Sequence, residues 1–284
     1  MKNSTILLAI SKDAALEDLG KTLETIRAIP AQVAILIVAA IPEYPYYALG
    51  VPAYSTAGFP EEWQRDISTI TTLLKEKAAA VEALLEQHDV AGDVDILSSE
   101  PALIADAIAR RAMLCDMALI GDDLRKPASL FRQLVYGILF QSPIGIMLNS
   151  HNAQPLGAPK RVFVAWNTHL HSARAVHQAL PLLRNAEEVI IATIDPVMTE
   201  YRDGEDPGVD VAKWLTHHGC TVTVEQYPSG GQEIGDCILA KSTECGADLI
   251  VMGSYGHSRT REAIFGGTTQ TLIEQTDQAV FLAH

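Results

Sequence analysis

The chain has 284 residues, of which 48% are hydrophobic, 20% charged and 6% aromatic, and its formal net charge is −14. This apolar share excludes general disorder, and the length predicts two domains or one large one. Acidic residues occur throughout without a basic segment, so neither nucleic acid nor an anionic membrane is expected as a partner. The sequence has no apolar run of ~20 residues, and its four cysteines form no CxxC pair, so we expect a reduced, cytoplasmic protein.

Buried strands alternate with helices along the first half of the chain. The apolar runs are short and continuous, which is typical of parallel strands covered on both faces. Strands are predicted at 4–10, 31–40, 94–97, 117–120 and 144–148, and helices at 14–29, 62–88, 101–113 and 128–141. The long loop 42–60 is rich in Pro and Tyr, and it is interpreted as a lid, a contact surface or a cover for the sheet edge.

The same order begins again after the polar segment 150–160, whose prolines and glycine indicate an interdomain linker. Strands are predicted at 161–167, 188–195, 221–224, 248–253 and 279–283, and helices at 172–183, 208–218, 232–246 and 268–276. Paired landmarks support a repeat, since CDMALIG (115–121) resembles ADLIVMG (247–253). The sequence therefore predicts two duplicated domains, 1–150 and 151–284, whose last strands pair about a pseudo-twofold axis.

The predicted fold is α/β, with two tandem doubly wound domains. Each domain is expected to hold a five-stranded parallel sheet, in the order 3-2-1-4-5, with helices on both faces. Ligands bind such sheets at the carboxyl ends of the strands, where the strand order reverses. In the second domain, Asn167 would then face Gly253 across this crevice, and Thr193 would line the neighbouring wall.

One glycine-rich loop in the second half has the spacing Gly253-x2-Gly256-x9-Gly266. It follows a predicted buried strand and leads into a helix that begins near Thr268. The start of a helix presents unpaired N–H groups and the positive end of the helix dipole, which together favour phosphate. Further donors come from His257, Arg259 and Arg261. The alternative interpretation is a flexible surface loop with its arginines in water.

Three other motifs give only weak evidence for a binding site. Gly20-Lys21-Thr22 resembles the end of a P-loop, but the upstream glycine is missing and the segment is predicted to be helix surface. The histidines 169, 171, 217 and 218 are expected to be solvated, because nothing in the sequence makes them converge as zinc ligands. The acidic group Asp203, Glu205 and Asp206 is predicted to be a solvated loop, with a weak cation site left open. No catalytic or metal-binding residues are predicted.

The segment VMGSYGHSRTREAIFGGTTQTL, the strand end VAWN and the repeated β/α order resemble the universal stress protein family in its tandem two-domain form. The resemblance implies that the glycine loop holds the ribose and phosphates of ATP. Asn167 stands where the family usually has Asp, which keeps an acceptor and removes a charge. Gly267 stands where the family has Ser or Thr, so Thr268 would have to supply the hydroxyl. The cofactor implied is ATP, alone or with Mg²⁺.

The complete nucleotide site expected on these grounds lies in the second domain. Its residues are Ala165, Asn167, Thr193, Met252, Gly253, Gly256, His257, Gly266, Gly267 and Thr268.

The corresponding loop of the first domain, IGDDLRKPASLFRQLVYG, departs from the motif. Leu124 replaces the second glycine, and Ser11 replaces the acid at the end of the first strand. Asp122 and Asp123 would repel phosphate. We therefore expect one nucleotide site per chain, with a first domain that is structural or binds something apolar through the loop 44–54.

These features favour a cytoplasmic stress-response regulator that senses an adenine nucleotide, forms a homodimer and hydrolyses ATP slowly at most. The alternative is a nucleotide-free scaffold, or a carrier of a small apolar ligand, in the same fold. A true phosphotransferase or hydrolase is disfavoured, because no general base and no Mg²⁺-binding carboxylates are evident near the loop.

Overall fold

The computed structural model describes residues 3–43, 61–150, 154–255 and 265–284. Two expected binding residues, Gly256 and His257, lie outside the described residues, and so does the loop 44–60. Among the helices that these ranges contain, none combines the length and the apolar character needed to cross a bilayer.

The N-terminal half alternates strands and helices in the predicted order. Its elements are β1 (Ser4–Ser11), α1 (Leu16–Arg27), β2 (Ala31–Ala40), α2 (Glu61–His88), β3 (Gly92–Ser99), η1 (Pro101–Leu103), α3 (Ile104–Ala112), β4 (Met117–Ile120), η2 (Asp122–Arg125), α4 (Ala128–Gln141) and β5 (Gly145–Leu148).

The C-terminal half repeats this order after a short 3-10 turn. Its elements are η3 (Gln154–Leu156), β6 (Arg161–Ala165), α5 (Leu170–Leu183), β7 (Glu188–Ile194), α6 (Val209–His217), β8 (Val222–Tyr227), α7 (Ile234–Glu244), β9 (Leu249–Gly253), α8 (Gly267–Glu274) and β10 (Val280–Ala283).

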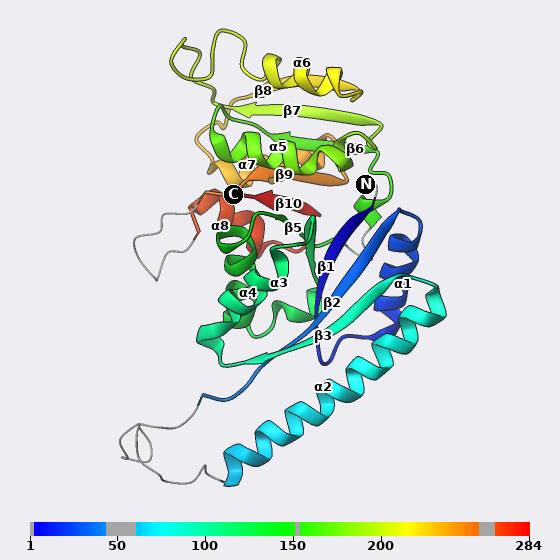
Figure 1. The fold of residues 1–284 in the computed structure, drawn as a ribbon. Coiled ribbons are helices and arrows are strands. Elements are labelled where there is room, and N and C mark those ends of the chain that lie inside the picture. The colour runs from blue at the N-terminus through cyan, green and yellow to red at the C-terminus, as the bar shows by residue number, and fades with distance from the viewer. Residues whose placement is uncertain (1–2, 44–60, 151–153, 256–264) are drawn as a thin grey trace, which may run out of the picture.

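All ten strands form one sheet, in the order β3-β2-β1-β4-β5-β10-β9-β6-β7-β8 (Figure 1). Each half therefore has the predicted order 3-2-1-4-5, and the pairs within each half are parallel. The two halves meet through an antiparallel pair, in which Val280 lies opposite Leu148 and Leu282 opposite Ile146. The predicted pairing of the last strands is confirmed. Because the sheet is continuous, the boundary between residues 150 and 151 stays a prediction.

Two apolar cores cover the two faces of this sheet. Buried side chains of α1, α2, α5 and α6 pack on one face, and those of α3, α4, α7 and α8 pack on the other. The strands are apolar on both sides, which explains why their sequences read as continuous apolar runs. At the junction of the halves, a Cβ on Gly145 would lie 2.2 Å from the ring of Phe281, so this glycine makes room for the ring across the β5–β10 pair.

Some boundaries differ from the prediction. The strand expected at 94–97 extends over Gly92–Ser99, because its whole length pairs with β2. Its polar residues gave a weak strand signal, but an edge strand tolerates them since much of it is exposed. The strand expected at 161–167 ends at Ala165, and α5 begins at Leu170, two residues earlier than predicted.

Candidate functional site

The carboxyl end of β9 lies directly beneath the first turn of α5. A Cβ on Gly253 would stand 2.4 Å from the carbonyl carbon of His171 and 2.5 Å from the amide nitrogen of Ser172. Any other residue would push the helix away, because real side-chain carbons do not approach a backbone this closely. The glycine therefore lets the amino end of α5 rest on the end of the strand.

The amino end of α8 is fixed to the same strand end. Gly266 donates its amide N–H to the carbonyl of Tyr255 at 2.9 Å. The Thr269 hydroxyl accepts the Tyr255 N–H at 3.1 Å and lies 3.4 Å from the Tyr255 carbonyl oxygen, to which it donates. Thr269 is almost completely buried, whereas a Cβ on Gly267 would meet nothing within 4 Å. The first N–H groups of α8 therefore begin at a position with open space beside it.

Two helix amino termini thus converge on the end of β9. The first N–H groups of an α-helix have no partner inside the helix, and the helix dipole places partial positive charge there. Leu170 begins α5 and Gly267 begins α8, and both helices contact the segment 253–255. This arrangement favours an anion at the strand end.

Aromatic and imidazole rings form a cluster at this strand end that sequence reasoning missed. His171 stacks on His284 with ring centroids 4.4 Å apart, and it meets the edge of Tyr255 at 5.6 Å. His284 also packs against Phe140 of the N-terminal half at 4.6 Å, and its Nδ1 lies 3.1 Å from the Ser254 carbonyl oxygen. A signal was present, because the predicted β10 runs beside β9 and so brings the last residue of the chain to this edge.

The environment of His171 disfavours a protonated imidazole. Burial lowers the pKa of His171 below its ordinary 6.5, and the neighbouring charges of His284, Arg174 and His169 lower it further. Its Nδ1 is buried without a hydrogen-bond partner among the described residues. The prediction that this histidine is solvated is therefore wrong, because the last strand places a second ring on it.

Asn167 lies in the turn between β6 and α5. Its Oδ1 accepts a hydrogen bond from the Ser172 hydroxyl at 2.6 Å, so the amide oxygen braces the first turn of α5. The side chain of Asn167 is nevertheless exposed. The turn is held further by Asp203, whose carboxylate accepts the N–H groups of Thr168 at 3.2 Å and Val197 at 2.8 Å. Asp203 is therefore an anchor between two loops, while Glu205 and Asp206 beside it are exposed, as predicted for a solvated loop.

The remaining strand residues of the expected site face two sides of the sheet. Ala165 and Met252 lie opposite each other in the β6–β9 pair, and both side chains belong to the core beneath α7 and α8. Thr193 lies on the other face, where its Cγ2 would be 3.6 Å from a Cβ on Gly208. Thr193 is 2% exposed, and its hydroxyl is buried without a partner among the described residues. The structure therefore does not bring Thr193 together with Ala165 and Met252.

The outer side of α8 is acidic. A cavity of about 300 Å³ opens beside Gly267 and Thr268, and it is also lined by the carboxylates of Glu233, Asp236 and Glu274. A phosphate group is disfavoured in this cavity, since like charges repel.

The N-terminal half fills the corresponding strand ends with its own carboxylate. Asp123 accepts a hydrogen bond from the backbone N–H of Ser11 at the end of β1, and its Oδ1 would lie 2.2 Å from a Cβ on Gly121. A cavity of about 300 Å³ lies beside it under α1, with an apolar floor that includes Leu8, Leu19 and Leu119. An anion would meet the Asp123 carboxylate here.

The structure also places the residues of the weaker sequence motifs. Gly20, Lys21 and Thr22 lie in α1, which confirms the predicted helix; Lys21 is exposed and pairs with Glu17 at 2.9 Å, whereas Gly20 is buried, so the surface assignment is wrong for this glycine. His218 packs on the ring of Trp214 at 4.2 Å, whereas His217 is exposed. Within the described ranges, no group of three or more His, Cys, Asp or Glu residues is placed to hold a metal ion.

Comparison with known proteins agrees with this architecture. The model of the universal stress protein family matches residues 159–284. A universal stress protein from Archaeoglobus fulgidus DSM 4304 superposes with a TM-score of 0.70 at 16% identity, over 100% of this chain and 99% of that chain. A functionally unknown protein, PA1789, from Pseudomonas aeruginosa PAO1 superposes with a TM-score of 0.53 at 13% identity, over 99% of this chain and 92% of that chain. No curated protein sequence matches the chain.

The family match covers the half that contains the glycine loop, and the structural likeness at these low identities concerns the fold of the whole chain. The universal stress protein family model therefore matches the C-terminal part of the chain, residues 159–284, and the N-terminal half repeats the same fold.

Proposed function

We propose that the C-terminal domain binds an adenine nucleotide, ATP or a close relative, at the carboxyl end of β9. The observation that carries the proposal is the meeting of two helix amino termini, those of α5 and α8, at Gly253 to Tyr255. Partial positive charge from both helices favours phosphate there.

The residues present fit a nucleotide in two respects. The stacked rings of His171 and His284 place imidazole nitrogen atoms close to the strand end. The acidic cavity lies on the outer side of α8, so the phosphates are expected on the side toward Tyr255. Mg²⁺, when it contributes, is expected to enter bound to the phosphates. Gly256 and His257 stay predicted contacts.

The expected role is that of a sensor. A nucleotide that binds the arrangement with α5 and α8 docked on β9 would increase the population of this arrangement, and a partner would recognise the resulting surface. We expect hydrolysis to be slow at most, because phosphoryl transfer needs a positioned base or water-orienting group and a stabilised leaving group. Release of inorganic phosphate from ATP measures this directly.

Nucleotide content and stoichiometry test the proposal. The purified protein is heat-denatured, the released small molecules are identified by mass spectrometry, and the nucleotide-free protein is titrated with ATP with and without Mg²⁺. One site per chain is expected, since Asp123 occupies the equivalent strand ends of the N-terminal half. Two sites would show that Asp123 does not exclude phosphate, and no binding at millimolar ATP would contradict the proposal.

A carrier of a small apolar ligand is the second candidate function. The cavity under α1 favours it, because its floor is apolar while the carboxylates of Asp18, Asp122 and Asp123 lie among its lining residues. Mass spectrometry of an organic extract of the same preparation would reveal such a ligand. Substitution of Leu19 by Glu should then abolish its retention without changing the ATP titration.

Assembly and location are proposed with the function. We expect a homodimer in the cytoplasm. Light scattering of the purified protein measures the mass of the particle and so the number of chains in it. A mass of one chain would contradict the dimer.

A further inference from the structure

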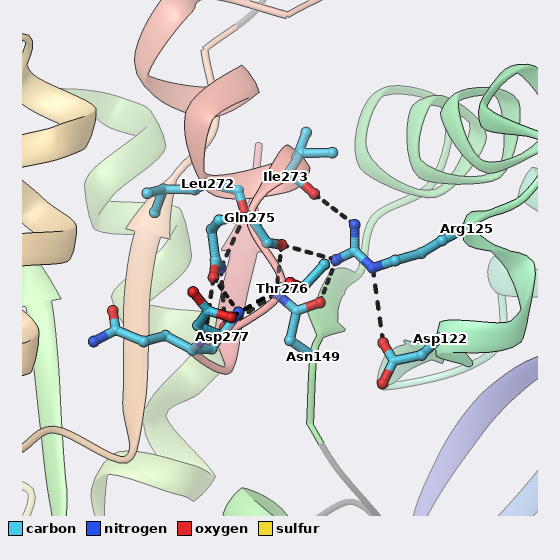
Figure 2. A network of polar contacts seen from close by, with 9 residues as sticks. Asp122, Arg125, Asn149, Leu272, Ile273, Gln275, Thr276 and Asp277 are labelled. Carbon is cyan, nitrogen blue, oxygen red and sulfur yellow. Dashed lines mark hydrogen bonds and ion pairs between the residues drawn. The ribbon is translucent and has the colours of Figure 1, made fainter.

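The loop after β4 in the N-terminal half contacts the carboxyl end of α8 in the C-terminal half. Arg125, at the end of η2, donates from Nη1 to the Ile273 carbonyl at 3.1 Å and from Nη2 to the Gln275 carbonyl at 3.1 Å (Figure 2). Ile273 lies in the last turn of α8 and Gln275 follows its last residue, so these carbonyls have no N–H donor inside the helix. The guanidinium therefore caps α8 from the other half of the molecule.

Asn149 completes the contact from the carboxyl end of β5. Its Nδ2 donates to the carbonyls of Gln275 at 2.9 Å and Gln278 at 3.1 Å, and its Oδ1 accepts a hydrogen bond from Arg125 Nη2. Asn149 is 2% exposed and has a φ of 55°, a left-handed conformation that asparagine tolerates better than most residues. We call Arg125 and Asn149 the α8 clamp.

The clamp is charged and partly shielded from water. Burial lowers the pKa of Arg125, and the Asp122 carboxylate, 3.8 Å from Nε, acts in the opposite direction. The guanidinium carbon also lies 4.7 Å from the centre of the Phe131 ring. A cation at this end of α8 is favourable, since the carboxyl end of a helix is the negative end of its dipole.

The position of α8 depends on contacts at both of its ends. The helix has eight residues, too few to be stable without packing, and spans about 12 Å at 1.5 Å per residue. Tyr255 and Thr269 hold its amino end, and the α8 clamp holds its carboxyl end. Loss of the clamp would free the helix to tilt, which would move the N–H groups at Gly267.

We propose that Arg125 and Asn149 are positioning residues through which the N-terminal half sets the nucleotide affinity of the C-terminal half. This inference rests on the proposed function for its affinity part. It gives the loop after β4 of the N-terminal half a role of its own, since this loop holds the helix of the other half.

Hydrogen exchange of the nucleotide-free protein and ATP titration test the inference together. In Arg125→Met, the α8 amides are expected to lose protection about tenfold, and the dissociation constant for ATP to rise about tenfold, within the usual range of coupling between sites. Asn149→Gly should act in the same direction, and it relieves rather than strains the backbone at this φ. It therefore keeps the test available if Arg125→Met folds poorly.

A matched control is Arg132 of α4, which contacts α8 through a surface ion pair. Arg132 reaches Glu274 at 3.7 Å, but both side chains are more than half exposed, so Arg132→Met should leave protection and affinity within twofold of the wild type. Unchanged protection of α8 in both clamp variants would overturn the clamp. Lost protection with unchanged ATP affinity would overturn the link to the site. Failure of the wild type to bind ATP would overturn the proposed function and the affinity part, while the exchange result would still decide the clamp.

Discussion

Gly253, at the start of the glycine loop, and Gly267, just after it, are glycines for different physical reasons. Gly253 is required by the backbone of α5, which lies where its side chain would be, whereas Gly267 borders open space. The motif predicts a ligand contact at Gly253, whereas Gly267 stands where the family has Ser or Thr. The structure separates a packing glycine from one that leaves the helix terminus accessible.

This difference predicts opposite outcomes for the same substitution. Gly253→Ala should destabilise the protein by about 1–3 kcal/mol, as overpacking in a tight interior does. Gly267→Ala should be neutral or slightly stabilising, because alanine lowers the entropy of the unfolded chain and favours helix. Urea denaturation of both variants measures the two free energies of unfolding. Equal losses would contradict the assignment.

The lowered pKa of His171 predicts that the free energy of unfolding depends on pH. The folded protein holds its pKa below 6.5, so it binds fewer protons than the unfolded chain as the pH falls through that value. The free energy of unfolding should therefore fall as the pH drops from about 6.5 toward the lowered pKa, and this contribution should change no further below it. In His171→Gln the melting temperature should depend less steeply on pH in this window. An unchanged slope would show that other groups cause the dependence.

Individual site residues were partly predictable. The glycine spacing, Asn167 and the strand end at Met252 could be found because they follow apolar runs of recognisable length. Arg125 could not be assigned, because its partners are far away in the chain and meet it only through the β5–β10 pair. His284 was missed although the predicted β10 runs beside β9 and brings it to this edge. The face of the sheet on which Thr193 lies depends on where β7 begins, since one residue of shift reverses every side chain.

At the scale of elements, the strands were predictable and the turns were not. Continuous apolar runs define β1, β2, β6 and β7, because both of their faces are covered. The turn that precedes α5 is held by a carboxylate from a distant loop, Asp203, and such a contact leaves no local pattern. Its acidic neighbours made it look like a solvated residue.

Asp203 gives a prediction about these two loops. Burial acts to raise its pKa, but the N–H groups of Val197 and Thr168 outweigh it and leave the pKa lowered. Asp203→Ala should cost about 1–3 kcal/mol at pH 7, the usual range for losing hydrogen bonds to a charged group. A lowered carboxylate pKa contributes stability above its unfolded value and loses it as the pH falls. The difference between variant and wild type should therefore shrink below about pH 4 in calorimetry, and a constant difference would contradict this role.

At the scale of the molecule, two domains share one sheet. The β5–β10 pair, the ring of Phe281 against Gly145 and the α8 clamp all cross between the halves. The repeat and the strand order were readable in the sequence, because the same landmarks recur. The asymmetry was readable in part, because Asp122 and Asp123 distinguish the N-terminal loop, but the stacked rings at the strand ends of the other half were missed.

A compensating pair of substitutions tests the junction. Gly145→Val should destabilise the whole protein by about 1–3 kcal/mol, because its side chain would occupy the space of the Phe281 ring. Phe281→Leu in the same chain should restore part of the loss by making room. Calorimetry of the two single variants and the double variant gives the coupling between them. Additive effects would contradict direct contact across the junction.

The central claim is that phosphate binds at the amino end of α8, and Gly267 tests it most directly. Glu at this position places a carboxylate at the amino end of α8, where it would repel a phosphate bound to the first N–H groups, while favouring the helix through its dipole. Gln has the same shape without the charge. Isothermal titration with ATP should show binding to the wild type, weaker binding to Gly267→Gln and none to Gly267→Glu, with all three folded by circular dichroism. Equal ATP affinity in the Glu and Gln variants would place the phosphate elsewhere and contradict the site.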